Sequence, residues 1–115
     1  MVNGVPTQGD IVMLNADPRK GHEQHGYRPY ICMSHRLVSD YANIAIFAPV
    51  SNTARKYPFY VPLERTETTG SVLLDQLVTI DYNARKFRYI ETVPLDYLRV
   101  LLDKVVLVFQ PNFLN

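Results

Sequence analysis

The chain has 115 residues, of which 47% are hydrophobic and 20% are charged, a composition typical of one soluble globular domain with one core. Twelve Lys and Arg against eleven Asp and Glu leave a formal net charge of only +1, so the overall charge gives no reason to expect nucleic acid. A basic binding site must therefore be local. We expect a single domain over residues 1–115, with its core at residues 9–110.

Cysteine content and hydropathy predict the compartment. The single cysteine, Cys32, excludes an internal disulfide, and no apolar run approaches the roughly 20 residues of a membrane span. Residues 1–8 lack the charged start and the apolar stretch of a signal peptide. These features predict a protein of the reducing cytoplasm that has no membrane partner.

Short runs rich in Ile, Val, Tyr and Phe alternate with eight prolines and five glycines, which is typical of many short strands. The predicted strands are residues 10–15, 29–34, 43–50, 57–63, 71–74, 76–82 and 87–93. Two prolines in residues 57–63 remove hydrogen-bond donors, so this run is expected at a sheet edge or at a sharp bend. Residues 36–42 and 53–56 are predicted loops, and residues 81–85 connect the last two strands.

The spacing of apolar residues changes in the C-terminal part of the chain. Apolar residues recur there at steps of three and four, at Leu95, Leu98, Leu102, Val105 and Phe109. This spacing predicts an amphipathic helix of about 16 residues, with Pro94 at its first helical position and Pro111 at its end. The predicted fold is mainly β with a C-terminal helix, which packs over one end of a small barrel-like sheet.

The longest polar stretch, residues 15–28, separates the first two predicted strands. Its HEQH segment suggests a metal site, but a zinc-binding helix needs two histidines four residues apart on one face. His22 and His25 are three residues apart, between Gly21 and Gly26, which disfavour a helix. We therefore predict no metal site and no cofactor.

Five motifs carry a family resemblance: GDIV at residues 9–12, DPRKGHEQHGYRP at 17–29, PVSNT at 49–53, YPF at 57–59 and DQ at 75–76. Together with the closing helix they resemble the MazF/PemK family, the endoribonuclease toxins of bacterial type II toxin-antitoxin systems. The resemblance runs from residue 9 to the end of the predicted helix. It implies an SH3-like barrel of the MazF/Kid/CcdB type and a two-fold homodimer.

The resemblance also implies an activity and partners. The expected activity is sequence-specific, metal-independent cleavage of single-stranded RNA, mainly mRNA, which inhibits translation and growth. The expected inhibitor is a MazE-like antitoxin, and a link to DNA through that antitoxin stays open. The sequence does not reveal the recognition sequence or which antitoxin binds.

Within the resemblance, Arg28 matches the family's catalytic arginine, and Ser51 falls at the position of its catalytic threonine or serine. Cleavage without a metal uses the 2'-hydroxyl of the RNA as the nucleophile and leaves a 2',3'-cyclic phosphate and a 5'-hydroxyl. An arginine fork matches the phosphate and stabilises its charge, and a serine hydroxyl orients it.

Further candidates for catalysis or substrate positioning are His22, Glu23, Gln24 and Asp75. Glu23 and Gln24 match the loop that shapes the family's site. His22 and Asp75 fall where the PemK branch places a histidine and an acid, but that branch has an arginine where this chain has Leu73. The general base stays open between His22, whose ordinary pKa of about 6.5 suits the task, and another group such as a deprotonated arginine.

RNA contacts are expected from basic, polar and aromatic side chains near these positions. The predicted RNA-binding residues are Lys20, Thr53, Arg55, Lys56, Tyr57 and Gln76. Tyr27, Phe59 and Tyr82 are additional candidates for stacking on exposed bases, although aromatic residues in strands more often belong to the core.

Two other classes share the expected barrel. CcdB-type toxins poison DNA gyrase and depend on a C-terminal tryptophan, whereas this chain has no tryptophan and ends in PNFLN. A binding module of the same fold without catalysis is the other alternative. An RNA-cleavage assay separates both classes from a nuclease.

Overall fold

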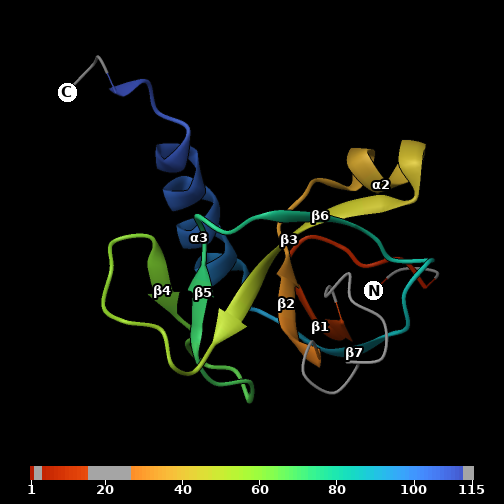
Figure 1. The fold of residues 1–115 in the computed structure, drawn as a ribbon, viewed down its shortest axis with the longest axis horizontal. Coiled ribbons are helices and arrows are strands. Elements are labelled where there is room, and N and C mark those ends of the chain that lie inside the picture. Colours follow the sequence, from red (N-terminus) through yellow and green to blue (C-terminus); the bar gives the residue numbers. More distant parts are fainter. Residues whose placement is uncertain (2–3, 16–26, 113–115) are drawn as a thin grey trace.

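In the computed structural model, residues 1, 4–15 and 27–112 are described. They form a curved sheet with one long helix beside it and one short helix at its far end (Figure 1). The elements in chain order are β1 (Asp10–Asn15), β2 (Tyr27–Cys32), α2 (Arg36–Ala42), β3 (Ile44–Ser51), β4 (Tyr60–Pro62), β5 (Ser71–Leu73), β6 (Val78–Asp81), β7 (Phe87–Thr92) and α3 (Leu95–Val108). The predicted class, mainly β with a C-terminal helix, is confirmed.

The sheet has the strand order β4-β5-β3-β2-β1-β7, and β6 also pairs with β3. All of these pairings are antiparallel. The long strand β3 pairs with β2 on one edge and with β6 and then β5 on the other. This double use of β3 curls the sheet into a barrel-like shape, in keeping with the predicted SH3-like fold.

Two apolar cores lie on the two faces of the curled sheet. Ile11 and Val12 are neighbours on β1 with alternating directions, and both are fully buried, each in a different core. Leu98 and Leu101 of α3 complete the core that contains Ile11. A buried leucine stabilises such a core by about 2 kcal/mol, so these contacts hold α3 against the sheet.

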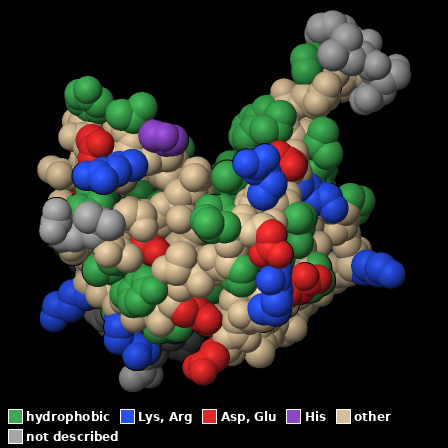
Figure 2. Space-filling view, turned by 180° about the vertical axis from the view of Figure 1, so that it is seen from behind, with side chains coloured by type: hydrophobic (Ala, Val, Ile, Leu, Met, Phe, Trp, Pro, Cys, Tyr) green, Lys and Arg blue, Asp and Glu red, His purple; other side chains and the backbone are tan. Residues whose placement is uncertain are grey.

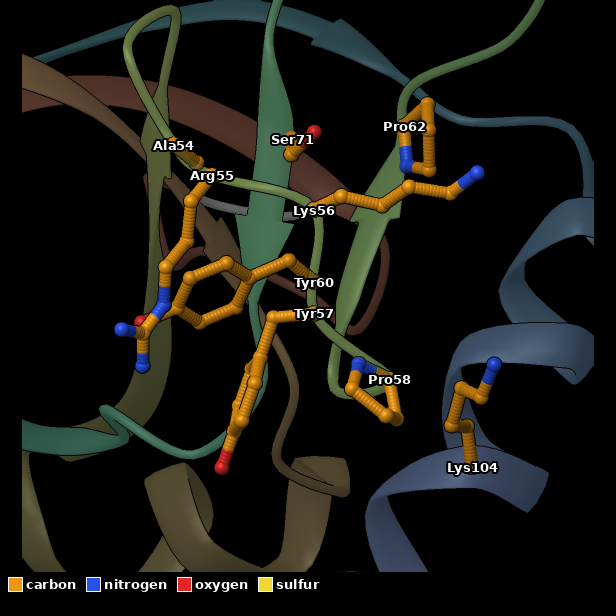
Figure 3. Close-up of a pocket in the computed structure, with 9 residues that line it drawn as sticks. All are labelled: Ala54, Arg55, Lys56, Tyr57, Pro58, Tyr60, Pro62, Ser71 and Lys104. Carbon is orange, nitrogen blue, oxygen red and sulfur yellow. The ribbon is translucent and has the colours of Figure 1, made fainter.

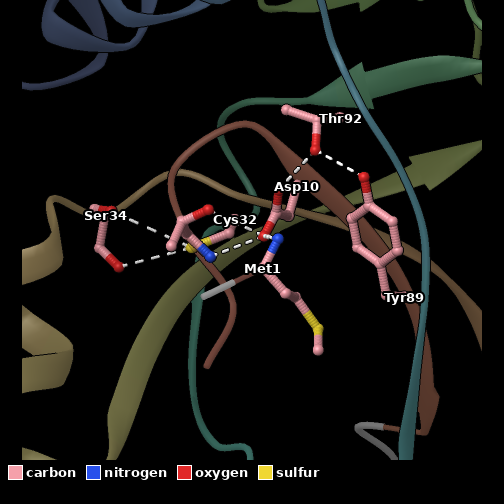
Figure 4. A network of polar contacts seen from close by, with 7 residues as sticks. Met1, Asp10, Cys32, Ser34, Tyr89 and Thr92 are labelled. Atoms are coloured by element: carbon pink, nitrogen blue, oxygen red, sulfur yellow. Dashed lines mark hydrogen bonds and ion pairs between the residues drawn. The ribbon is translucent and has the colours of Figure 1, made fainter. Parts of the chain in front are cut away.

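Asp10 is a buried carboxylate at the start of β1, 1% exposed (Figure 4). It accepts hydrogen bonds from the backbone N–H and hydroxyl of Thr7, at 2.8 and 2.9 Å, and from the Thr92 hydroxyl at 2.7 Å. The Met1 amino group lies 3.0 Å away, and Tyr89 contacts the Thr92 hydroxyl at 2.8 Å. Burial alone would raise the pKa of Asp10, but these hydrogen bonds outweigh it and hold the pKa below its ordinary value.

The only cysteine lies beside this network. Cys32 is fully buried on β2, and its Sγ contacts the carbonyl oxygen and the hydroxyl of Ser34 at 4.0 and 3.9 Å. Burial raises the pKa of the Cys32 thiol, so it stays protonated and acts as a small apolar side chain.

Several predicted boundaries need correction. Strand β1 matches its prediction, whereas only Tyr60–Pro62 of the predicted strand 57–63 pairs with a neighbour. Pro94 is the N-cap of α3, with an extended backbone, and not its first helical residue. Leu95 and Phe109 belong to the predicted apolar face but are 83% and 70% exposed, so the two ends of that face are not part of the core.

The predicted loop 36–42 is wrong, since these residues form α2. The His35 ring accepts a hydrogen bond from the Leu37 N–H at 3.0 Å and so caps the helix start. Asn43 ends the helix in the left-handed conformation, with φ of 50°. Among the described residues, no helix is long and apolar enough to cross a membrane.

Candidate active site

The strand pairing brings the two predicted catalytic residues to one end of the sheet. Arg28 lies exposed at the start of β2, and Ser51 is the last residue of β3. These strands are antiparallel neighbours, with Tyr30 opposite Pro49. Arg28 and Ser51 each lie two residues beyond that pair, on the same side of it.

Ser51 is held in a tight turn. Its Oγ accepts a hydrogen bond from the Thr53 N–H at 3.2 Å and lies 3.2 Å from the Thr53 hydroxyl. The side chain of Asn52, between them, accepts a hydrogen bond from the Thr69 hydroxyl at 3.0 Å. On the far edge of β3, Ser51 pairs with Ser71 of β5. The turn therefore presents two hydroxyl groups from a fixed backbone.

A groove of about 630 Å³ lies beside this turn (Figure 3). Its wall carries two tyrosine rings, Tyr57 and Tyr60, whose centroids are 4.7 Å apart with planes tilted by 60°. The Arg55 guanidinium lies 5.2 Å from the centre of the Tyr57 ring, close enough for a cation–π contact. Lys56 and, from α3, Lys104 add positive charge to the same groove.

Asp75 and Gln76, which follow β5, support the two rings. Burial, and then the neighbouring Asp75 carboxylate that accepts its hydrogen bond, raises the pKa of the Tyr57 hydroxyl. The Gln76 side-chain amide donates to the Tyr60 hydroxyl at 3.0 Å. The groove thus combines positive charge with two oriented aromatic faces, a combination that is typical of sites for single-stranded nucleic acid.

Most of the predicted site residues that lie within the described ranges come together in the structure. Seven predicted residues lie in the turn, in the groove or directly behind it: Ser51, Thr53, Arg55, Lys56, Tyr57, Asp75 and Gln76. Tyr60 and Lys104 are among the groove residues that the sequence prediction lacks. Lys104 is far from the motifs along the chain, so only the packing of α3 reveals it.

Other predicted residues differ in outcome. Lys20, His22, Glu23 and Gln24, and with them the rejected HEQH metal motif, lie outside the described residues. Within the described ranges, no group of three or more His, Cys, Asp or Glu could hold a metal ion.

The aromatic candidates outside the groove differ in their exposure to solvent. Tyr82 is 3% exposed and packs edge-on against Phe87, so it is a core residue, and its ring is not available for base stacking. Tyr27 is exposed at the start of β2, where its hydroxyl donates to the Lys86 carbonyl at 3.2 Å. Phe59 is partly buried and packs against the core that contains Leu98.

Fold and groove together define a small β protein with a cationic, aromatic cleft beside an arginine and a serine. Residues 7–109 match the family model described as the PemK-like, MazF-like toxin of type II toxin-antitoxin systems. The chain belongs to this family, which confirms the resemblance found in its motifs.

Curated relatives with similar sequences belong to the same family. The Escherichia coli K12 endoribonuclease toxin MazF is 32% identical over 101 residues, covering 88% of this chain and 91% of that protein. The Escherichia coli endoribonuclease PemK is 33% identical over 103 residues, covering 85% of this chain and 77% of that protein.

Solved structures with a similar fold support the same family assignment. The crystal structure of MazF from Deinococcus radiodurans has a TM-score of 0.78 and 31% identity, with 91% of this chain and 96% of that chain covered. A MazE-MazF structure from the same organism has a TM-score of 0.75 and 26% identity, with coverages of 91% and 95%.

Proposed function

We propose that the protein is a sequence-specific, metal-independent endoribonuclease that cleaves single-stranded mRNA in the cytoplasm and thereby inhibits translation and growth. The observation that carries this proposal is that Arg28 and Ser51 lie at the same end of the neighbouring strands β2 and β3, and that Ser51 pairs with Ser71, which lines the cationic groove. The names of the relatives, endoribonuclease MazF and PemK, support the same activity.

The chemistry follows from the groups available. The 2'-oxygen attacks the adjacent phosphorus, its proton passes to a base, and the bond from phosphorus to the 5'-oxygen breaks while that oxygen gains a proton. Arg28 stabilises the negative charge that builds up on the phosphate, because its fork donates two parallel hydrogen bonds. Ser51 donates a hydrogen bond that fixes the phosphate. His22 or a deprotonated arginine supplies the base.

The groove supplies affinity for the bases around the cut. A base stacked on the Tyr57 or Tyr60 ring gains about 1 to 3 kcal/mol, and Arg55, Lys56 and Lys104 attract the adjacent phosphates. Single-stranded RNA suits this groove because its bases are free to turn outward.

The experiment is cleavage of a long transcript in the presence of a chelator. Cleavage should continue, leave 2',3'-cyclic phosphate and 5'-hydroxyl ends, and stop when the 2'-hydroxyl before the cut is replaced by hydrogen. A 5'-phosphate product or loss of activity in chelator would contradict the mechanism. Intact RNA would favour the alternatives, a gyrase poison or an inactive binding module, and a supercoiling assay with gyrase separates these two.

We also propose a homodimer that is inhibited by a MazE-like antitoxin. MazE-MazF structures supply the precedent for the antitoxin. Apolar side chains gather on the protruding end of α3, where Val106, Leu107 and Phe109 are at least half exposed (Figure 2). Such a surface favours self-association, and two-fold dimers are its commonest form. A monomeric mass in light scattering, or antitoxin and RNA bound together without competition, would contradict this proposal.

A further inference from the structure

The carboxylate of Glu91, on β7, holds the loop 63–70 that joins β4 to β5. Its Oε1 accepts from the Glu67 N–H at 3.1 Å, and its Oε2 accepts from the N–H and hydroxyl of Thr68 at 2.7 and 2.6 Å. Burial alone would raise the pKa of Glu91, but these hydrogen bonds outweigh it and lower the pKa. Glu91 is therefore ionised at neutral pH, and its charge strengthens all three bonds.

The other side of the same loop touches the candidate active site. The hydroxyl of Thr69, the neighbour of Thr68, donates to the Asn52 side chain at 3.0 Å. Gly70 has a φ of 120°, and a Cβ atom there would lie 2.8 Å from the Ser51 carbonyl oxygen. The loop backbone is thus packed directly against the turn that carries Ser51.

A second anchor holds the start of this loop. Arg65 donates to the Asp96 carboxylate at 2.8 Å, and both side chains are more than half exposed. This pair joins the loop to α3, away from Asn52. It provides a matched control, because it restrains the same loop through α3, whereas Thr69 reaches the turn through Asn52.

We propose that Glu91 is a positioning residue for RNA cleavage: by holding Thr68 it places Thr69, which fixes Asn52 within the Ser51–Thr53 turn. The inference rests on the proposed function. Glu91 suits this role because it lies on a paired strand, opposite Ile11 of β1, and so offers a rigid support. A turn that loses this support samples other geometries, which slows the chemical step more than it weakens RNA binding.

The first test compares kcat and KM of Glu91→Ala and Asp96→Ala on one RNA substrate. In Glu91→Ala, kcat should fall about tenfold while KM stays within about twofold. Asp96→Ala should retain both constants. An unchanged kcat in Glu91→Ala, or an equal loss in Asp96→Ala, would overturn the proposal. If Glu91→Ala fails to fold, Glu91→Gln serves instead, because it keeps the shape and one acceptor oxygen and should lose part of the rate.

The second test asks whether the effect passes through the Thr69–Asn52 bond. Thr69→Val removes the donor with little change in shape. Combined with Glu91→Ala, it should lower kcat no further than the more severe single variant, whereas multiplied losses would refute this route.

A readout without RNA completes the design. The amide NMR signals of Asn52 and Thr53 should shift in Glu91→Ala and in Thr69→Val and stay in place in Asp96→Ala. Unchanged signals in Glu91→Ala would overturn the inference. A wild-type chain that leaves RNA intact would instead overturn the proposed function, so the two failures are distinguishable.

Discussion

Arg28 and Ser51 lie at the same end of two antiparallel neighbours, each two residues past the Tyr30–Pro49 pair. Residues equally far from a paired position on antiparallel strands lie opposite each other when the register continues. A guanidinium and a hydroxyl from such positions can converge on one phosphate. The strand register thus accounts for why two residues 23 positions apart in sequence form one candidate site.

Arg28→Ala should abolish RNA cleavage with little change in stability. Loss of a preorganised stabiliser raises the barrier by about 3 to 4 kcal/mol, which lowers the rate about 100-fold to 1000-fold. Since Arg28 is exposed, the free energy of unfolding should change by less than about 0.5 kcal/mol. Cleavage rates and thermal unfolding of the same samples measure both quantities.

Two further variants sharpen this prediction. Arg28→Lys should also lose RNA cleavage, because an ammonium group lacks the planar fork of hydrogen-bond donors. Arg36→Ala is the matched control: Arg36 is an exposed arginine on α2, at the opposite end of β3, and its loss should leave cleavage intact. Near-normal cleavage by Arg28→Ala, or a large fall in its melting temperature, would remove Arg28 from the site.

Ser51→Ala should cause a smaller but clear loss of cleavage. The substitution removes the hydroxyl that bonds to Thr53, so the turn loses both a phosphate donor and an internal contact. Ser51→Thr should retain activity, because it keeps the hydroxyl. Single-turnover cleavage rates of the two variants test the role of the hydroxyl. Equal losses of rate in both variants would point to a steric role of Ser51 instead.

Elements with one strong periodic signal could be predicted from sequence. The apolar run of β1 predicts its bounds, and the three-and-four spacing predicts α3. The helix α2 was not predicted from the sequence, because it buries no apolar stripe with the spacing of a helix. Its residues Leu37 and Tyr41 are 57% and 86% exposed. Its start is marked by His35, which is not among the common capping residues.

The candidate site divides in a similar way. Motifs that are contiguous in sequence suggested Arg28 and Ser51. The groove residue Lys104 and the Thr69–Asn52 hydrogen bond depend on how α3 and the loop 63–70 pack against distant strands. Such contacts are set by tertiary pairing, so local patterns cannot predict them.

Tyr57→Ala should weaken RNA binding about 5-fold to 150-fold, the equivalent of about 1 to 3 kcal/mol of lost stacking. Tyr57→Phe should bind nearly as well as wild type, since it keeps the aromatic face. Tyr41→Ala is the control, because Tyr41 is a tyrosine on α2 that is 86% exposed and far from the groove along β3. Fluorescence anisotropy with a labelled oligonucleotide measures these affinities. Equal affinities of Tyr57→Ala and Tyr41→Ala would exclude stacking on this ring.

Gly70→Ala should destabilise the fold by about 1 to 3 kcal/mol and also slow cleavage. A methyl group at this position would lie 2.8 Å from the Ser51 carbonyl oxygen, and the φ of 120° disfavours any side chain. Gly4→Ala serves as control, because Gly4 also has a positive φ, of 74°, but nothing lies within 4 Å of its added Cβ. Urea unfolding should therefore separate the two variants, and an equal small cost for both would show that the Ser51 contact relaxes freely.

Asp10 should make the stability of the fold sensitive to acid. Its folded-state pKa lies below the ordinary value of about 3.9, so its carboxylate stabilises the folded state above that pH. This contribution is lost as the pH falls through the folded-state pKa, because the protonated acid accepts the hydrogen bonds from Thr7 and Thr92 less well.

Asp10→Asn isolates this effect, since it removes the charge and keeps the shape. At neutral pH the variant should be less stable than wild type by about 1 to 3 kcal/mol, because the amide presents donors where Thr7 and Thr92 also donate. The difference should shrink as the pH falls through the lowered folded-state pKa of Asp10, below which the wild-type carboxyl group is also neutral. Asp103→Asn, which changes an exposed carboxylate on α3, should differ from wild type by less than about 0.5 kcal/mol at each pH. Urea unfolding across this range tests the sign, and a gap between Asp10→Asn and wild type that stays constant with pH would show that the Asp10 charge does not contribute.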